Sequence, residues 1–282
     1  MQNEVTEIET DVLVVNLFEG VTSPGGATGA VDKMIGGLIT DLIVDGEISG
    51  SESELTLIHT SNSVYPDLKA SRVLIAGLGS SDRIDTNAIR RVSATVIRKL
   101  REVGVKKFAT IVHGAGIGGV DVSSSAQSLV EGSLLGAYRF LKYRTTDTKR
   151  KPDVESMVIV ESDSSKLTAI GAAIKKGVTY SNAEILARDL VNEPANKLSP
   201  ANLASVALKV ANDNGLQCEV LDEADVSALG MGAYTGVAQG SSRPLKFIHM
   251  SYLGDSSNLE NNLWLIGKGI TFDSGGISLK PG

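Results

Sequence analysis

The chain has 282 residues, and at about 150 residues per domain this length predicts two domains. Its 33 acidic and 27 basic residues give a formal net charge of −6, which argues against a dedicated nucleic-acid-binding protein and against a basic membrane-binding surface. Hydrophobic residues make up 42% and charged residues 21%, so neither a disordered nor a fibrous protein fits. The one cysteine, Cys218, excludes an internal disulfide.

The first ten residues, MQNEVTEIET, are polar and acidic and lack the basic-then-apolar pattern of a secretory signal. No apolar run approaches the length of about 18 residues that a membrane-spanning helix needs. We therefore expect a cytoplasmic protein without membrane attachment.

Short β-branched runs alternate with stretches of helical period, which predicts an α/β fold with a parallel or mixed sheet covered by helices. In the first half of the chain, strands are predicted to begin at Val12, Leu55, Arg72, Phe108 and Ser156. In the second half they are predicted to begin at Cys218, Lys246 and Asn262.

Apolar residues at intervals of three and four predict an amphipathic helix between Asp85 and Gly104, and a second helix over about 125–141. The basic stretch 142–153 reads as an exposed loop. A long helix-compatible run without strand signals, residues 164–191, predicts the helix that links the two domains. A further helix opens with Ser199 as cap and Pro200 at its first position, and closes on Gly215.

Gly114, Gly116 and Gly119 form a G-x-G-x-x-G pattern directly after a predicted strand. A dinucleotide site also needs a helix that opens at once and an acidic residue about 20 positions on. Here VDVSSS intervenes before the predicted helix, and residues 132–146 contain no Asp or Glu. A glycine-rich turn is the favoured interpretation, and phosphate binding through backbone N–H groups stays open as a weaker hypothesis.

The histidines, the serines and the cysteine give only weak indications of a catalytic or metal site. His59, His113 and His249 lie at strand ends or in apolar strands and are too far apart for a local zinc motif, so structural roles are favoured. No G-x-S-x-G motif is present. Cys218 is predicted to be a buried, inert thiol.

The segment WLIGKGITFDSGGISLKPG, which ends the chain, places charged residues among glycines after an apolar run. Asp273 offers oxygen ligands for divalent cations, and Lys268 could join such a site as the neutral amine. Lys280 could remain a cation and stabilise a developing oxyanion. The alternative is a lysine–aspartate pair on the surface.

Together with RDLVNEPANKLSP and MGAYTGVAQGSSRPLKFI, this segment resembles the leucyl (cytosol) aminopeptidase family. The resemblance implies an amino-terminal macrodomain-like α/β domain at 1–165 and a linking helix at 166–188. It implies that 189–282 form the first part of an α/β catalytic domain with a central mixed sheet, incomplete at its C-terminal end.

The resemblance also implies the chemistry. Lys268 corresponds to a ligand of one metal ion, Asp273 to a carboxylate that reaches two metal ions, and Lys280 to the catalytic lysine that polarises the scissile carbonyl. The cofactors implied are two divalent ions, Mn²⁺ or Zn²⁺. The substrates implied are peptides with a free N-terminus, with leucine preferred there, and the assembly implied is a homo-hexamer.

The family pattern continues beyond this sequence with a further metal-binding aspartate and a motif like NTDAEGR. One aspartate and one neutral lysine cannot hold two divalent cations. We therefore expect the 282 residues to be a fragment that is inactive alone. Two alternatives stay open: a non-catalytic module that binds a nucleotide or anion, and an inactive relative that assembles with complete subunits.

Overall fold

The computed structural model describes residues 1–61, 63–146 and 151–272. The chain divides into two compact units, unit 1 (Met1–Ile185) and unit 2 (Leu186–Gly282). Each unit is described by itself.

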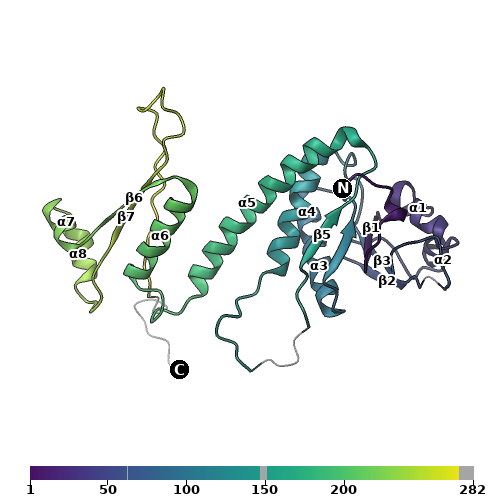
Figure 1. The fold of residues 1–282 in the computed structure, drawn as a ribbon, viewed down its shortest axis with the longest axis horizontal. Coiled ribbons are helices and arrows are strands. Elements are labelled where there is room, and N and C mark those ends of the chain that lie inside the picture. Colours follow the sequence, from purple (N-terminus) through teal and green to yellow (C-terminus); the bar gives the residue numbers. More distant parts are fainter. Residues whose placement is uncertain (62, 147–150, 273–282) are drawn as a thin grey trace. The chain divides into compact units, whose positions relative to one another are not determined.

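Unit 1 is built on a five-stranded sheet in the order β2-β3-β1-β4-β5 (Figure 1). The central strand β1 pairs in parallel with β3 and with β4, β4 pairs in parallel with β5, and β2 runs antiparallel to β3. The strands are β1 (Leu13–Leu17), β2 (Leu55–His59), β3 (Arg72–Gly77), β4 (Lys107–Thr110) and β5 (Ser156–Ile159). The mixed sheet predicted from the sequence is therefore confirmed.

Helices cover both faces of this sheet, because its strands carry apolar residues on both sides. Val14 of β1 and Leu74 of β3 pack in a core with α3, α4 and α5, whereas Val15 and Ile75 pack with α1 and α2. The helices of unit 1 are α1 (Gly26–Met34), α2 (Leu38–Val44), α3 (Thr86–Glu102) and α4 (Val122–Ala137), with short 3-10 turns at Val5–Glu7 and Ser164–Lys166. Helix α5 (Leu167–Asn192) begins in unit 1, and its last turns belong to unit 2.

The five strands predicted in the first half are all present, and α3 begins after the predicted cap Asp85, whose Oδ1 accepts a hydrogen bond of 2.6 Å from the N–H of Ala88. Helix α4 begins earlier than predicted. Asp121 caps it by accepting hydrogen bonds from the N–H groups of Ser123 and Ser124, so VDVSSS is mostly helix and not a spacer. The glycine-rich turn consequently leads into a helix almost directly.

Unit 2 contains a two-stranded antiparallel sheet, and α6 packs against both of its strands. Its elements are α6 (Pro200–Asn214), β6 (Gln217–Leu221), α7 (Glu223–Ala228), α8 (Gly232–Ala238) and β7 (Phe247–Ser251). Helix α6 has the predicted start and end, because Ser199 and Asn202 form a reciprocal capping box and Gly215 ends the helix with a φ of 68°.

Two expectations for unit 2 were wrong. Residues 262–270, predicted as a strand, form none in the structure, because no neighbouring strand offers them a hydrogen-bonded partner among the described residues. Cys218 is half-buried, and not buried, because its strand belongs to a sheet of only two strands.

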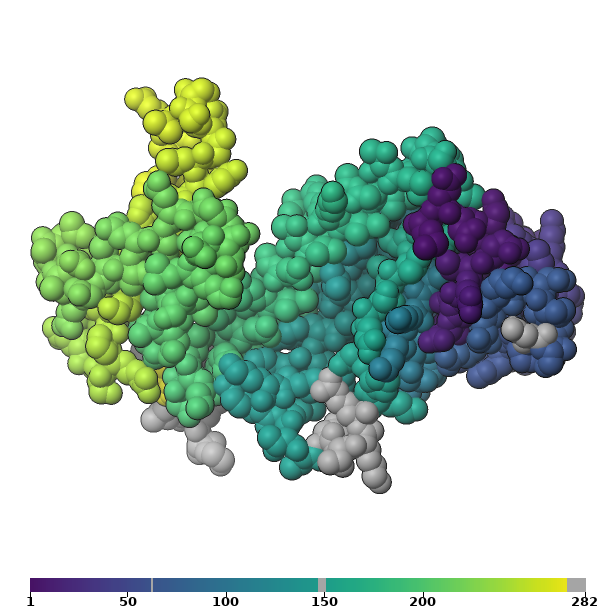
Figure 2. All heavy atoms as spheres, in the orientation of Figure 1, coloured from purple at the N-terminus to yellow at the C-terminus, as the bar shows by residue number. Residues whose placement is uncertain are grey.

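Few side chains of unit 2 form a core. Within residues 186–272, the buried apolar side chains are Ala204, Ala211, Val226 and Leu245. Four consecutive apolar residues, by contrast, are 71–95% exposed: Leu263, Trp264, Leu265 and Ile266. The chain that follows β7, yellow in Figure 2, projects from the helices of unit 2.

Candidate functional site

The glycine-flanked Lys268 is the one predicted metal-site residue that the structure describes, and its side chain is exposed. Asp273 and Lys280 lie outside the described residues. The geometry of the predicted site is therefore not given by the structure, and the roles of these three residues stay predictions.

The described ranges contain no group of three His, Cys, Asp or Glu side chains that could hold a metal ion. Hard divalent cations need several oxygen ligands, and a lysine amine supplies none. The residues that the structure describes do not by themselves fit a divalent metal site, so we derive no catalytic step through a metal.

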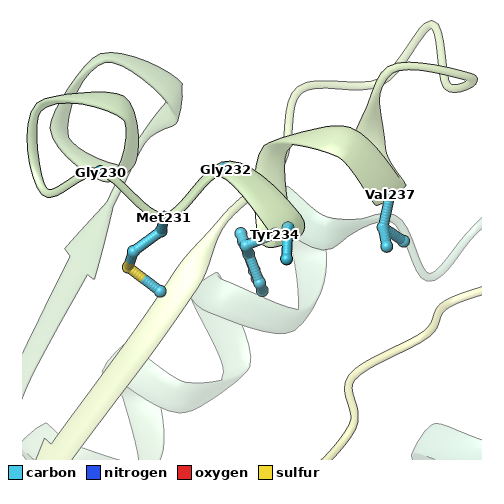
Figure 3. A pocket seen from close by; sticks show the side chains of 6 residues that line it. Gly230, Met231, Gly232, Tyr234 and Val237 are labelled. Atoms are coloured by element: carbon cyan, nitrogen blue, oxygen red, sulfur yellow. The ribbon is translucent and has the colours of Figure 1, made fainter.

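An apolar hollow of about 540 Å³ lies on the surface of α8 in unit 2, lined by residues 230–234 and 237 (Figure 3). Tyr234 is held there: its hydroxyl donates a hydrogen bond of 2.6 Å to the carbonyl oxygen of Lys246, and its ring meets Phe247 edge-on at 5.7 Å. Met231 and Val237 flank it. The lining carries no ionisable group apart from the tyrosine phenol. Such a hollow is suited to binding an apolar group of another molecule and lacks the acid and base groups that catalysis needs.

Unit 1 has a cavity of about 450 Å³ where β1 and β4 end. One wall is the loop after β1 and the start of α1, including Phe18, Gly26 and Thr28. The other wall is the loop after β4, including Ile111 and Gly114. This loop carries the sequence's G-x-G-x-x-G pattern, whose glycines Gly114, Gly116 and Gly119 all have positive φ angles.

Three polar residues tie the ends of β1 and β4 together beside this cavity. The Nε2 atom of His113 lies 3.3 Å from Oγ1 of Thr110, and its Nδ1 atom lies 3.5 Å from Oδ1 of Asn16. His113 is only 1% exposed, and this burial lowers its pKa from 6.5 to about 4. A neutral imidazole therefore occupies the site at neutral pH.

Sequence analysis missed this arrangement. Asn16 lies on β1 and Thr28 on α1, and the Thr28 hydroxyl donates a hydrogen bond of 2.7 Å to the carbonyl oxygen of Asn16. The stretch around Thr28, SPGGATG, reads as a loop by composition, although a glycine-rich segment within a few residues of a strand end could have drawn attention to it.

Comparison with known proteins assigns both halves of the chain to one family. Residues 14–147 match the "Cytosol aminopeptidase family, N-terminal domain", and residues 185–282 match the "Cytosol aminopeptidase family, catalytic domain". The chain belongs to the cytosol aminopeptidase family. The resemblance seen in the sequence is thus confirmed, and the family is one of enzymes.

Relatives and solved structures agree with this assignment. The chain is 34% identical to a probable cytosol aminopeptidase of Alkaliphilus oremlandii and 38% identical to one of Solibacter usitatus, over 100% and 98% of its length. It covers 55% and 52% of those proteins, so it spans about half the length of these cytosol aminopeptidases.

Among solved structures, the bottromycin maturation enzyme BotP in complex with Mn has a TM-score of 0.73 at 26% identity, over 96% of this chain and 50% of that one. A K354E mutant of tomato leucine aminopeptidase has a TM-score of 0.73 at 22% identity, over 89% of this chain and 49% of that one. The second likeness supports the α/β fold.

Within the described residues, no helix is both long and apolar enough to cross a membrane.

Proposed function

We propose that this chain contributes to a metal-dependent aminopeptidase that removes N-terminal residues, leucine preferentially, from peptides. The observation that carries the proposal is the match of residues 185–282 to the family's catalytic domain, because this match includes Lys268, Asp273 and Lys280. The domain organisation proposed is 1–165, the linking helix 166–188 and catalytic residues 189–282.

Lys268 and Asp273 would hold the metal, and Lys280 would act on the substrate carbonyl as a cation. Two divalent ions, Mn²⁺ or Zn²⁺, would supply Lewis acidity and an activated water for hydrolysis. A likeness to BotP, solved in complex with Mn, supports a divalent metal. One carboxylate and one amine are only part of such a ligand set.

Catalysis therefore needs further polypeptide, in the same chain or in another subunit. The small number of buried apolar side chains in residues 186–272 supports this, as do the exposed side chains of Leu265 (90%) and Ile266 (95%). Contiguous exposed apolar side chains are uncommon on soluble proteins and mark an interaction site. A homo-hexamer in the cytoplasm is the assembly and location we propose for the active enzyme.

The test compares two proteins. One is the 282-residue chain, and the other is this chain continued by the part of the Alkaliphilus oremlandii relative that it does not cover. With Mn²⁺ or Zn²⁺, we expect negligible hydrolysis of leucine anilide by the first and turnover by the second. The fluorescence of Trp264, the one tryptophan, is expected to shift to the blue in the second as its indole is covered.

The two parts of the proposal fail separately. Turnover by the 282-residue chain at a rate near that of the longer protein would refute the need for further polypeptide. A longer protein that folds, shows the blue shift and hydrolyses no aminoacyl anilide would refute the aminopeptidase assignment.

A further inference from the structure

The end of α6 carries the dipeptide Asn214–Gly215, and no other asparagine in the sequence is followed by glycine. Asparagine is one of the chemically labile residues of proteins, and a following glycine has no side chain to hinder attack by its backbone nitrogen. Both residues are exposed, and a Cβ atom built on Gly215 would have no described atom within 4 Å. Water therefore reaches the pair, and no packed group blocks a reaction between its two members.

Two hydrogen bonds hold this pair in the folded protein. The Nδ2 atom of Asn214 donates to the carbonyl oxygen of Val210 at 2.8 Å, so the side-chain amide is held toward the preceding turn. The N–H of Gly215 donates to the carbonyl oxygen of Ala211, as does the N–H of Leu216 at 2.9 Å. The nitrogen of Gly215 and the amide of Asn214 are thus kept from each other while the last turn of α6 is closed.

Opening of this turn releases both groups. The last carbonyl groups of a helix lack intrahelical donors, so helix ends open at little cost in free energy. Here Ala211 is buried, whereas residues 212–215 are all exposed. The end of α6 therefore opens without uncovering much apolar surface, and the open form brings Asn214 and Gly215 together.

We propose that Asn214 is a site of spontaneous deamidation. In the open turn, the backbone nitrogen of Gly215 attacks Cγ of Asn214 and forms a new C–N bond. The bond from Cγ to Nδ2 breaks, and the NH₂ group leaves with the proton of the Gly215 nitrogen as ammonia. Water then opens the resulting cyclic imide at either of its two carbonyl carbons. Aspartate or isoaspartate is left at position 214, and no group is oxidised or reduced.

Either product disturbs the connection between α6 and β6. A carboxylate cannot donate to the carbonyl oxygen of Val210 as Nδ2 does, and its negative charge lies at the C-terminal end of α6, where the helix dipole disfavours it. In isoaspartate the main chain also runs through Cγ and gains one carbon, just before β6 begins at Gln217. The modification falls within the residues that match the catalytic domain, and it does not depend on aminopeptidase activity.

Peptide mapping by mass spectrometry, on the 282-residue chain aged in mildly alkaline buffer, tests the proposal. We expect Asn214 to give aspartate and isoaspartate at least tenfold faster than Asn212, which lies in the same turn but precedes an aspartate. In urea we expect the rate at Asn214 to rise at least fivefold, because the hydrogen bonds to Val210 and Ala211 are then lost.

Two results would overturn the proposal. One is an Asn214 that stays intact in buffer or reacts no faster than Asn212. The other is an equal rate at Asn214 with and without urea, because opening of the last turn of α6 would then play no part in the reaction.

Two variants measure what the modification does to the fold. Asn214→Asp reproduces one product, and its matched control Asn212→Asp adds the same charge to the same turn but keeps the Asn214–Val210 hydrogen bond. Hydrogen exchange at the N–H of Leu216 reports on this turn, because that group donates to Ala211. We expect at least threefold faster exchange in Asn214→Asp than in Asn212→Asp. Equal exchange in the two variants would refute the effect on the α6–β6 connection.

Discussion

The guanidinium of Arg90 on α3 donates a hydrogen bond from Nε to Oε2 of Glu131 on α4, at 2.6 Å. The Glu131 carboxylate is almost buried, with 9% of its side chain exposed, and Nε2 of Gln127 donates to its other oxygen at 2.6 Å. Buried carboxylates are tolerated only when paired in this way. The pair thus fixes the packing of two helices on one face of the sheet.

Arg90→Met should lower the free energy of unfolding of unit 1 by about 1–3 kcal/mol, because it leaves the Glu131 carboxylate without its charged partner. Urea denaturation followed by far-UV circular dichroism measures this. The neighbouring Arg91 is the control: it pairs with Glu52 on the surface and lowers the pKa of that carboxyl through a side-chain hydrogen bond. Arg91→Met should cost less than about 1 kcal/mol, and an equal cost for both variants would contradict the argument.

The same two helices approach closely at a glycine. A Cβ atom at Gly132 of α4 would lie 2.3 Å from the carbonyl oxygen of Arg90 and 2.7 Å from its Cα. Gly132→Ala should therefore destabilise unit 1 by about 1–3 kcal/mol by forcing α3 and α4 apart. Gly171 of α5 has no atom within 4 Å of its would-be Cβ, so Gly171→Ala should stabilise the helix by up to about 1 kcal/mol. Thermal unfolding of both variants would show opposite shifts, and shifts of the same sign would contradict the prediction.

The strands of unit 1 and helix α3 could be predicted because their apolar residues follow the periods of two and 3.6 residues. Helix α1 could not, because the stretch between Ser23 and Gly37 is rich in glycine, and α2 could not, because its seven residues are too few to show a helical period. Tertiary contacts hold this region: the buried Asp32 accepts hydrogen bonds from the N–H of Ile39 at 2.7 Å and from the hydroxyl of Thr40 at 2.6 Å. No local sequence pattern predicts that this carboxylate is buried and hydrogen-bonded.

The candidate sites also divide into features that local sequence patterns predict and features that depend on tertiary contacts. Motif spacing was sufficient to identify the family and to single out Lys268. The cavity at the ends of β1 and β4 depends on the pairing of Leu13 with Ala109, which lie 96 residues apart in sequence, and composition does not reveal this pairing. An apolar run such as 263–266 predicts a strand but cannot supply the neighbour that a strand needs.

The buried His113 should make unit 1 sensitive to mild acid. Its pKa is about 4 in the folded protein and 6.5 in the unfolded chain, so between these values protons bind the unfolded state and stability falls as the pH is lowered. The full effect is about 3 kcal/mol, complete near pH 4 and absent above about pH 7.

Comparing His113→Gln with the unchanged protein separates the pH dependence of stability that is due to His113 from the part that is due to the carboxylates. The stability of the unchanged protein relative to the variant should decline between pH 6.5 and 4 and stay constant from pH 7 to 8. Urea denaturation at each pH measures the difference. If the difference in unfolding free energy between the two proteins stayed constant from pH 6.5 to 4, His113 would take up its proton equally well in the folded and unfolded states, and the prediction would be wrong.

The proposed catalytic roles make distinct predictions for the longer protein that continues residues 1–282 with the rest of the Alkaliphilus oremlandii relative. Lys280→Ala should lower kcat by about 10²–10³ with little change in KM, because the cation acts on charge that develops during reaction. Asp273→Ala should abolish the stimulation of activity by Mn²⁺, because it removes a metal ligand. Steady-state hydrolysis of leucine anilide across a range of Mn²⁺ concentrations separates the two effects.

Lys209 provides the matched control for these variants, since it is an exposed lysine on α6 whose partner is Asp213, one helical turn away. Lys209→Ala should leave kcat and the Mn²⁺ dependence unchanged, because it removes the same charge without touching the proposed site. Lys280→Ala kinetics equal to those of Lys209→Ala would refute the role of Lys280. Full Mn²⁺ stimulation in Asp273→Ala would refute its assignment as a ligand, because a metal held elsewhere would then carry the activity.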